Sequence, residues 1–245
     1  MLRTLIFGML TLMLAAGTTG RAQDGPKVEP GFMPLFNGKD LTGWKYLRTP
    51  KESVEGKTET SDGRISVKDG IIVVHEKDNK GKGGTFDLYT VKDFAKDFIL
   101  RMEFRAAPKA DSGVYIRGPQ LQVRDYPTVG PYKPKGFKNA AWNDLEIVVK
   151  AVPPSKTTKV NGKTLTDKDL LELNFRDGKT EAKLNGKTID VTKYEVTQGP
   201  AATAECKCNG EVLEKAFPVP AKGGIGLQAE TGKFEFRNIR VKELD

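Results

Sequence analysis

Apolar and polar residues alternate over much of the sequence, most clearly between residues 97 and 126. Side chains at every second position of a β-strand point to the same face, so each alternating run predicts a half-buried strand. Three such runs follow one another here, separated by turn residues at 111–113 and 118–119. The polar positions of these three runs are Arg101, Glu103, Arg105, Tyr115, Arg117, Gln120, Gln122 and Arg124.

Similar alternating segments recur along most of the remaining chain, and Asn-Gly or Asp-Gly pairs typical of hairpin turns stand between several of them. No long amphipathic helical pattern interrupts them. We therefore predict an all-β fold, a two-sheet antiparallel sandwich of jelly-roll type, with the polar segment 152–169 as a surface insertion. The expected core residues are Phe98, Leu100, Met102, Phe104, Val114, Ile116, Leu121, Val123, Ile147, Val149 and Leu227.

Residues 1–22 have the pattern of a secretory signal peptide. Arg3 precedes an apolar run over residues 5–16, and Gly20-Arg21-Ala22 fits a small-x-small cleavage site. That run is too short to span a bilayer comfortably, and no later segment is apolar enough to be transmembrane. We expect a single mature domain over residues 23–245, exported to the periplasm or to the outside of the cell.

Charge and cysteine content narrow the functional classes only slightly. The formal net charge is +8 at pH 7, but the lysines are spread along the chain and no nucleic-acid-binding motif is present. Weak attraction to anionic glycans stays open. Cys206 and Cys208 are so close that a disulfide between them would be strained, so a labile bridge and free thiols are both open. His75, the single histidine, could transfer protons or be an ordinary strand-end residue.

The polar positions of the three central runs suit a polyhydroxylated ligand if the strands are neighbours in one sheet. Arginine and glutamine can hydrogen-bond pairs of hydroxyl groups, and tyrosine adds an apolar ring face. The alternative is a solvated sheet face without function, which is common in antiparallel sheets.

Several motifs occur in the order typical of one protein family. They are LFNGKDLTGW at 35–44, DFILRMEFR at 97–105, DSGVYIRG at 111–118, QLQVRD at 120–125, WNDLEIVVK at 142–150, LNGK at 184–187 and GGIGLQAETGKFEFRNIRVKEL at 223–244. Together they resemble the 3-keto-disaccharide hydrolase domain family of exported bacterial proteins. The resemblance covers nearly the whole mature chain. It implies a concanavalin A-like lectin/glucanase fold and hydrolase or lyase action on 3-keto-glycosides or related sugars.

The sequence departs from the family pattern at three places. Gln120 stands where the family usually has glutamate, and Ala229-Glu230-Thr231 replaces the usual Asp-His-Gly after Leu-Gln. An insertion also separates the Trp-Asn strand from the Leu-Asn-Gly hairpin. The first two changes remove a carboxylate and a histidine that could transfer protons. A non-catalytic glycan-binding or scaffold domain on the same fold is therefore the alternative function.

The catalytic candidates are Glu103, Glu230 and Asp125, and the candidate substrate-binding residues are Arg101, Tyr115, Arg117, Gln120, Gln122, Tyr132, Trp142 and Gln228. Glu103 would be held ionised by neighbouring arginines and act as base, with Glu230 or Asp125 as acid. Structural roles are the alternatives: Glu103 in a surface ion pair, Trp142 in the core, Tyr132 pinning its loop. We expect the binding residues of the central strands to converge on one concave face, roofed by residues 127–139.

The expected partner is a carbohydrate, with no nucleic acid and no membrane span. The sequence predicts no oligomeric state. No calcium loop or other metal-ligand spacing is recognisable, although the carboxylates present leave assistance by Ca²⁺ open.

Overall fold

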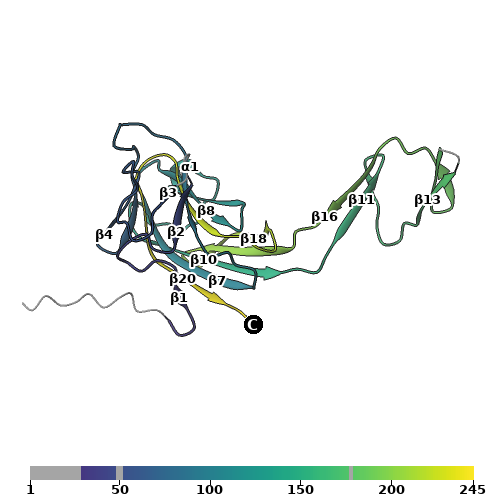
Figure 1. Cartoon of the computed structure of the whole chain (residues 1–245). Helices are drawn as coiled ribbons and strands as arrows, with labels where there is room; N and C mark the ends of the chain where they lie inside the picture. The colour runs from purple at the N-terminus through teal and green to yellow at the C-terminus, as the bar shows by residue number, and fades with distance from the viewer. Residues whose placement is uncertain (1–28, 48–51, 177–178) are drawn as a thin grey trace, which may run out of the picture.

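The computed structural model describes residues 29–47, 52–176 and 179–245, which form an all-β protein with two main sheets (Figure 1). Sheet A contains, in spatial order, β18 (Glu211–Val219), β17 (Ala202–Cys208), β10 (Asn143–Ala151), β7 (Phe98–Ala106), β20 (Phe234–Glu243), β5 (Ile71–Val74) and β4 (Ile65–Lys68), with β1 (Met33–Pro34) paired to β20. Sheet B contains β3 (Glu52–Ser53), β2 (Trp44–Leu47), β6 (Phe86–Thr90), β19 (Ile225–Ala229), β8 (Asp111–Ile116) and β9 (Gln120–Arg124). The predicted two-sheet antiparallel sandwich is confirmed.

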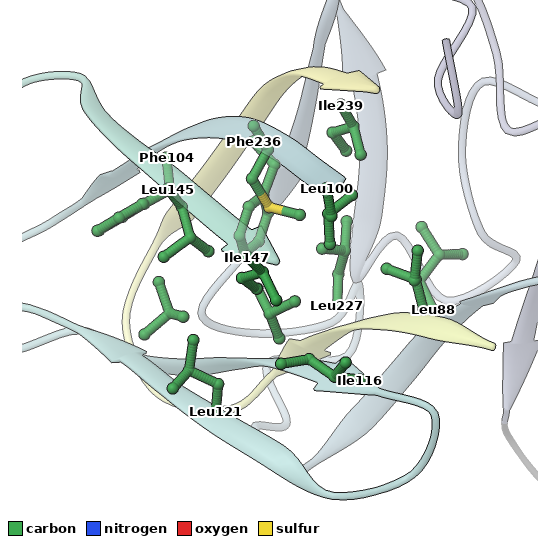
Figure 2. Packing of buried hydrophobic residues seen from close by; sticks show 14 of the residues in the cluster. Leu88, Leu100, Phe104, Ile116, Leu121, Leu145, Ile147, Leu227, Phe236 and Ile239 are labelled. Atoms are coloured by element: carbon green, nitrogen blue, oxygen red, sulfur yellow. The ribbon is translucent and has the colours of Figure 1, made fainter. Parts of the chain in front are cut away.

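The inner faces of the two sheets enclose one hydrophobic core. Figure 2 shows Leu100 and Ile147 of sheet A and Ile116 and Leu121 of sheet B within this cluster. Alternation explains the packing, because every second residue of β7 is buried while its neighbours are partly exposed. All eleven residues expected in the core are buried.

The expectation that the three central runs lie side by side in one sheet is wrong. Strand β7 pairs with β10 and β20 in sheet A, whereas β8 and β9 pair with each other in sheet B. The short segment between them crosses from one sheet to the other, with the Ala107 amide donating to the carbonyl of Lys233 at 3.0 Å. Alternation tells which side of a strand is buried but not which sheet the strand joins.

An arm leaves the sandwich after β10 and returns at β17, and Figure 1 shows it projecting away from the two main sheets. One of its sheets contains β12 (Lys163–Thr164), β11 (Lys156–Val160) and β16 (Tyr194–Gln198), and the other contains β13 (Leu171–Arg176), β14 (Lys179–Leu184) and β15 (Lys187–Ile189). The arm is longer than the insertion predicted over 152–169, because the Leu-Asn-Gly hairpin belongs to it and not to the sandwich.

The only helix in the described ranges is the single turn α1 (Tyr126–Val129), and no described helix is long and apolar enough to cross a membrane. The predicted signal peptide lies outside the described residues, so cleavage and export remain predictions. His75 lies at the end of β5, where its Nε2 is 2.8 Å from the Ser66 hydroxyl oxygen.

Both cysteines are free thiols whose side chains face the core from β17. Cys206 is paired in register with Ile147, and Cys208 with Leu145, so the thiols lie on the inner face of sheet A. Burial raises the pKa of each thiol to about 12. Neither thiol has the thiolate character that a nucleophile or a redox site needs.

Paired leucine substitutions test the core. Leu100 is fully buried, whereas Leu170 on the arm is 61% exposed. Leu100→Ala should lower the free energy of unfolding by about 2–5 kcal/mol, because it leaves a cavity between the sheets. Leu170→Ala should change it by about 0.5 kcal/mol or less. Chemical denaturation of both variants gives the comparison, and equal losses would contradict the assigned core.

Thiol labelling tests the burial of the cysteine pair. In the folded protein, Cys206 and Cys208 should react with a disulfide reagent far more slowly than a model thiol, because both are inaccessible and protonated. Full reaction of both should appear only in denaturant. Rapid labelling of the native protein at neutral pH would show that β17 opens readily.

Candidate functional site

The outer face of sheet B carries a continuous group of polar and aromatic side chains, which we call the polar face. Strand order brings them together, since β6, β19, β8 and β9 are consecutive neighbours. In register, Asp87 is opposite Gln228 and Tyr115 is opposite Gln120. The polar face consists of Asp87, Tyr89, Asp111, Tyr115, Gln120, Gln122, Arg124, Gln228 and Glu230.

Two tyrosine rings form the aromatic part of the polar face. Tyr89 and Tyr115 are stacked, with ring centroids 5.1 Å apart and planes inclined by 29°. They flank Gly226, which pairs with both in the sheet. A Cβ at Gly226 would lie 2.8 Å from the Tyr89 ring, so only glycine allows this ring to lie against β19. Such a ring surface can pack against the apolar face of a sugar.

A chain of hydrogen bonds crosses four strands of the polar face. The Gln120 side-chain amide donates to the Gln228 side-chain carbonyl, and Gln228 Nε2 donates to the Tyr115 hydroxyl at 3.2 Å. Tyr115 is hydrogen-bonded in turn to the carboxyl of Asp87. A Cβ at Gly113 would lie 2.1 Å from the Gln120 amide nitrogen, so glycine at this position leaves room for Gln120 to reach Gln228.

Two carboxyl groups of the polar face, Asp87 and Glu230, have raised pKa values. Burial raises the pKa of Asp87, the Tyr115 hydrogen bond opposes this shift, and the charge of Glu230 adds to it. Burial and the charge of Asp111 raise the pKa of Glu230, which Arg124 partly offsets. Arg124 also forms an ion pair with Asp111 at the edge of the polar face. Desolvated, mutually repelling carboxyl groups are typical of proton-transfer sites.

Two acceptor atoms of the polar face are left without a partner among the described residues. Asp87 Oδ1 and Gln122 Oε1 are buried and accept no hydrogen bond there. Buried acceptors are normally satisfied, and leaving one unpaired costs free energy. Hydroxyl groups of a bound sugar could donate to both atoms.

Five predicted site residues meet on the polar face: Tyr115, Gln120, Gln122, Gln228 and Glu230. Convergence of the whole predicted set on one face is wrong, because Arg101 and Glu103 belong to β7 in sheet A. The cause is the crossing between sheets that follows β7.

The sheet A candidates form ion pairs and ring contacts on the other side of the sandwich. The Glu103 carboxylate accepts hydrogen bonds from Arg237 Nε at 2.7 Å and from Asn238 Nδ2 at 2.5 Å. Arg237 also lies over the Trp142 ring, 4.0 Å from its centroid. Arg101 pairs with Glu146 at 2.8 Å. These contacts match the structural alternative raised for Glu103.

Three further candidates support loops and strand ends. Arg117 is 5% exposed and donates to the carbonyls of Lys96 at 2.5 Å and Pro220 at 3.2 Å. The carboxylate of Asp125 accepts a hydrogen bond from the Lys109 amide at 2.8 Å. The Tyr132 hydroxyl donates to Glu214 at 2.8 Å, which fits the loop-pinning alternative.

Sequence reasoning missed Asp87 and Tyr89. The run TFDLYT was recognisable as a strand, and its alternation places both residues opposite the buried Leu88. No sequence signal showed that β6 would lie beside β19. In the described part of the chain, no group of three or more His, Cys, Asp and Glu side chains could hold a metal ion.

Comparison with known proteins identifies the family. Residues 31–242 match the 3-keto-alpha-glucoside-1,2-lyase-like domain. The chain belongs to this family. A 3-keto-disaccharide hydrolase of Bacteroides thetaiotaomicron is 27% identical over 255 residues, which cover 88% of this chain and 79% of that protein. The family membership confirms the resemblance found in the sequence and makes the chain a hydrolase/lyase-like domain of carbohydrate chemistry.

Solved structures show weaker similarity. A Parabacteroides distasonis protein provisionally described as a glycosyl hydrolase is 19% identical with a TM-score of 0.45, covering 88% of this chain and 94% of that one. The carbohydrate-binding module CBM66 of Bacillus subtilis is 13% identical with a TM-score of 0.34, covering 82% and 96%. The sandwich assignment follows from the strand pairings and not from these similarities.

The raised pKa of Asp87 predicts a pH-dependent effect of Asp87→Asn. A carboxyl group with a raised pKa in the folded state favours folding only while protonated, so its stabilisation is lost as pH rises through the folded pKa. The variant lacks this loss. Its free energy of unfolding should therefore rise relative to the unmodified protein between about pH 4 and pH 7, as measured by denaturant titration at several pH values.

Asp40→Asn provides a control of opposite sign. Hydrogen bonds from Thr42 and Asn37 lower the pKa of Asp40, so its ionised form stabilises the fold above the ordinary carboxyl pKa. This variant should become less stable, relative to the unmodified protein, over the same rise in pH. The same sign for both variants would contradict the environment assigned to Asp87.

Proposed function

We propose that the chain cleaves 3-keto-glycosides or closely related sugars, as a lyase or hydrolase, on the polar face of sheet B. The observation that carries the proposal is the pair of desolvated carboxyl groups, Asp87 and Glu230, beside the tyrosine rings and glutamine amides. Family membership supports the reaction class. The 3-keto-disaccharide hydrolase of Bacteroides thetaiotaomicron supports the substrate class.

Elimination from a 3-keto-glycoside needs one base and one acid. The ketone at C3 makes the proton on C2 acidic, and a base removes it. The C2–H electron pair forms the C1–C2 double bond, the C1–O bond breaks, and an acid protonates the departing oxygen. Hydrolysis would use the same two groups, with water adding at C1.

The different environments of the two carboxyl groups favour one assignment of these roles. Burial raises the pKa of Asp87, but the Tyr115 hydrogen bond opposes this shift and favours the ionised form, which suits a base. Burial and Asp111 keep the pKa of Glu230 raised, which suits an acid that enters the reaction protonated. Because the charge of Glu230 raises the pKa of Asp87, protonation of Glu230 makes ionisation of Asp87 easier.

The rest of the polar face would bind the sugar. The stacked rings of Tyr89 and Tyr115 offer a surface for the apolar side of a pyranose. The unpaired acceptors of Asp87 and Gln122 would accept hydrogen bonds from its hydroxyl groups. In this proposal Glu230 is the acid, as expected from the sequence, and Asp87 is the base in place of Glu103.

Turnover of 3-keto-disaccharides by the purified protein tests the proposal. Glu230→Gln and Asp87→Asn should each lower kcat by about 10²–10⁴-fold, the usual contribution of a positioned acid or base. Glu103→Gln is the matched control on sheet A and should retain activity, since its carboxylate pairs with Arg237. Thermal unfolding of each variant checks that the fold is intact.

The other outcomes decide between the alternatives. Glycan binding without turnover would support the non-catalytic glycan-binding domain. Turnover that survives both Asp87→Asn and Glu230→Gln would contradict the assigned carboxyl pair while leaving the enzyme class intact. Loss of activity in Glu103→Gln alone would move the site to sheet A.

A further inference from the structure

Arg64 has a fully buried side chain with an unusual set of partners. Its guanidinium donates to backbone carbonyls of three separate segments: Glu76, Gly84 at 3.0 Å and Glu230 at 2.5 Å. Burial lowers the pKa of this arginine. Placing a cation inside a protein costs several kcal/mol in order of magnitude unless hydrogen bonds compensate. The three carbonyls supply part of that compensation at the two Nη atoms, and the charges of Asp62, Asp78 and Glu76 also favour the cation.

Two of these bonds bridge a gap in sheet B. The register between β19 and β6 ends at the pair Ala229 and Phe86. Beyond it, Thr231 exchanges both backbone hydrogen bonds with Asp111, at 2.8 and 3.1 Å. Glu230 stands between Ala229 and Thr231, the residues of these two pairings, and β6 does not extend far enough to pair with it. Arg64 Nη2 donates to the Glu230 carbonyl and to that of Gly84. This one nitrogen therefore links the two segments beyond the end of their backbone pairing.

The two bridged segments lead to the two polar-face carboxyl groups whose pKa is raised, Asp87 and Glu230. Gly84 stands two residues before β6, the strand that contains Asp87, and the second bridged carbonyl is that of Glu230 itself. These carboxyl groups repel each other when both are ionised. Without the guanidinium, the part-buried Glu230 carbonyl would lose this hydrogen bond, so the segment would relax toward water.

We propose that Arg64 is a positioning residue that fixes the backbone of Glu230 and thereby sets the place of its carboxyl group relative to Asp87. The chemical consequence rests on the proposed function, in which these carboxyl groups are acid and base. The positioning of the Glu230 backbone by Arg64 follows from the hydrogen bonds alone and does not depend on the proposed reaction. Arg64 itself acts only through the main chain and is not a catalytic residue.

Arg64→Lys, compared with Arg117→Lys, tests the proposal. Arg117 is a matched control because it is also a buried arginine that donates to two backbone carbonyls, and burial lowers its pKa as well. Its partners, Lys96 and Pro220, do not belong to the polar face. Both variants should lower the melting temperature. Only Arg64→Lys should lower kcat, on the order of 10²-fold with KM little changed, as for a displaced reacting group.

The pH profile separates positioning from general destabilisation. Exposure of Glu230 would remove the burial that raises its pKa, so the alkaline limb of kcat should move to lower pH in Arg64→Lys and stay in place in Arg117→Lys. Carboxyl carbon-13 NMR of Glu230 should show the same shift without any turnover. Equal profiles and equal Glu230 titrations in the two variants would overturn the proposal.

The remaining outcomes distinguish the two inferences. If the unmodified protein turns over no 3-keto-glycoside, the proposed function fails, and the Glu230 titration still decides the role of Arg64. If Arg64→Lys does not fold, guanidinium NMR of the unmodified protein replaces it. The Arg64 Nη protons should exchange slowly and shift as Glu230 titrates, whereas those of Arg117 should not. Absence of that coupled shift would overturn the positioning role.

Discussion

The contact between the inner faces of two antiparallel sheets determines everything else in this structure. Residues such as Phe104 and Phe236 of sheet A pack in the same core as Ile116 and Leu227 of sheet B. Because the inner faces are filled by this packing, a ligand of the two main sheets has to bind on an outer face. The two outer faces differ in one respect. The sheet A candidates are engaged in ion pairs and cation–π contacts, whereas the polar face of sheet B retains unpaired acceptors.

The sequence predicted the burial of individual residues better than the neighbours of each strand. Alternation is a local property of the chain, so it correctly assigned Leu100 and Ile116 to the core. Strand order is a long-range property that depends on where each connection crosses the sandwich. The crossing after β7 could not be read from residues 107–110, and it moved Glu103 away from Tyr115.

The sequence predicted those residues of the candidate site that lie in motifs of the family pattern. Gln120, Gln122, Gln228 and Glu230 all belong to such motifs and meet on one face. Asp87 lies in a short strand outside those motifs, and only the pairing of β6 with β19 brings it to the site. The net charge of +8 likewise gave no hint that three carboxyl groups would gather beside one arginine.

The arm has a consequence for how this protein can change over time. The residues at which it leaves and rejoins the sandwich, Ala151 and Ala202, are direct partners in the ladder between β10 and β17. A chain that took a short turn between these two positions would preserve every other pairing of sheet A. The entropic cost of closing a loop grows only slowly with its length, so a longer arm between these positions costs little stability. Length and composition of the arm can therefore vary without disturbing the polar face, so the arm is a module on which a second specificity could arise independently.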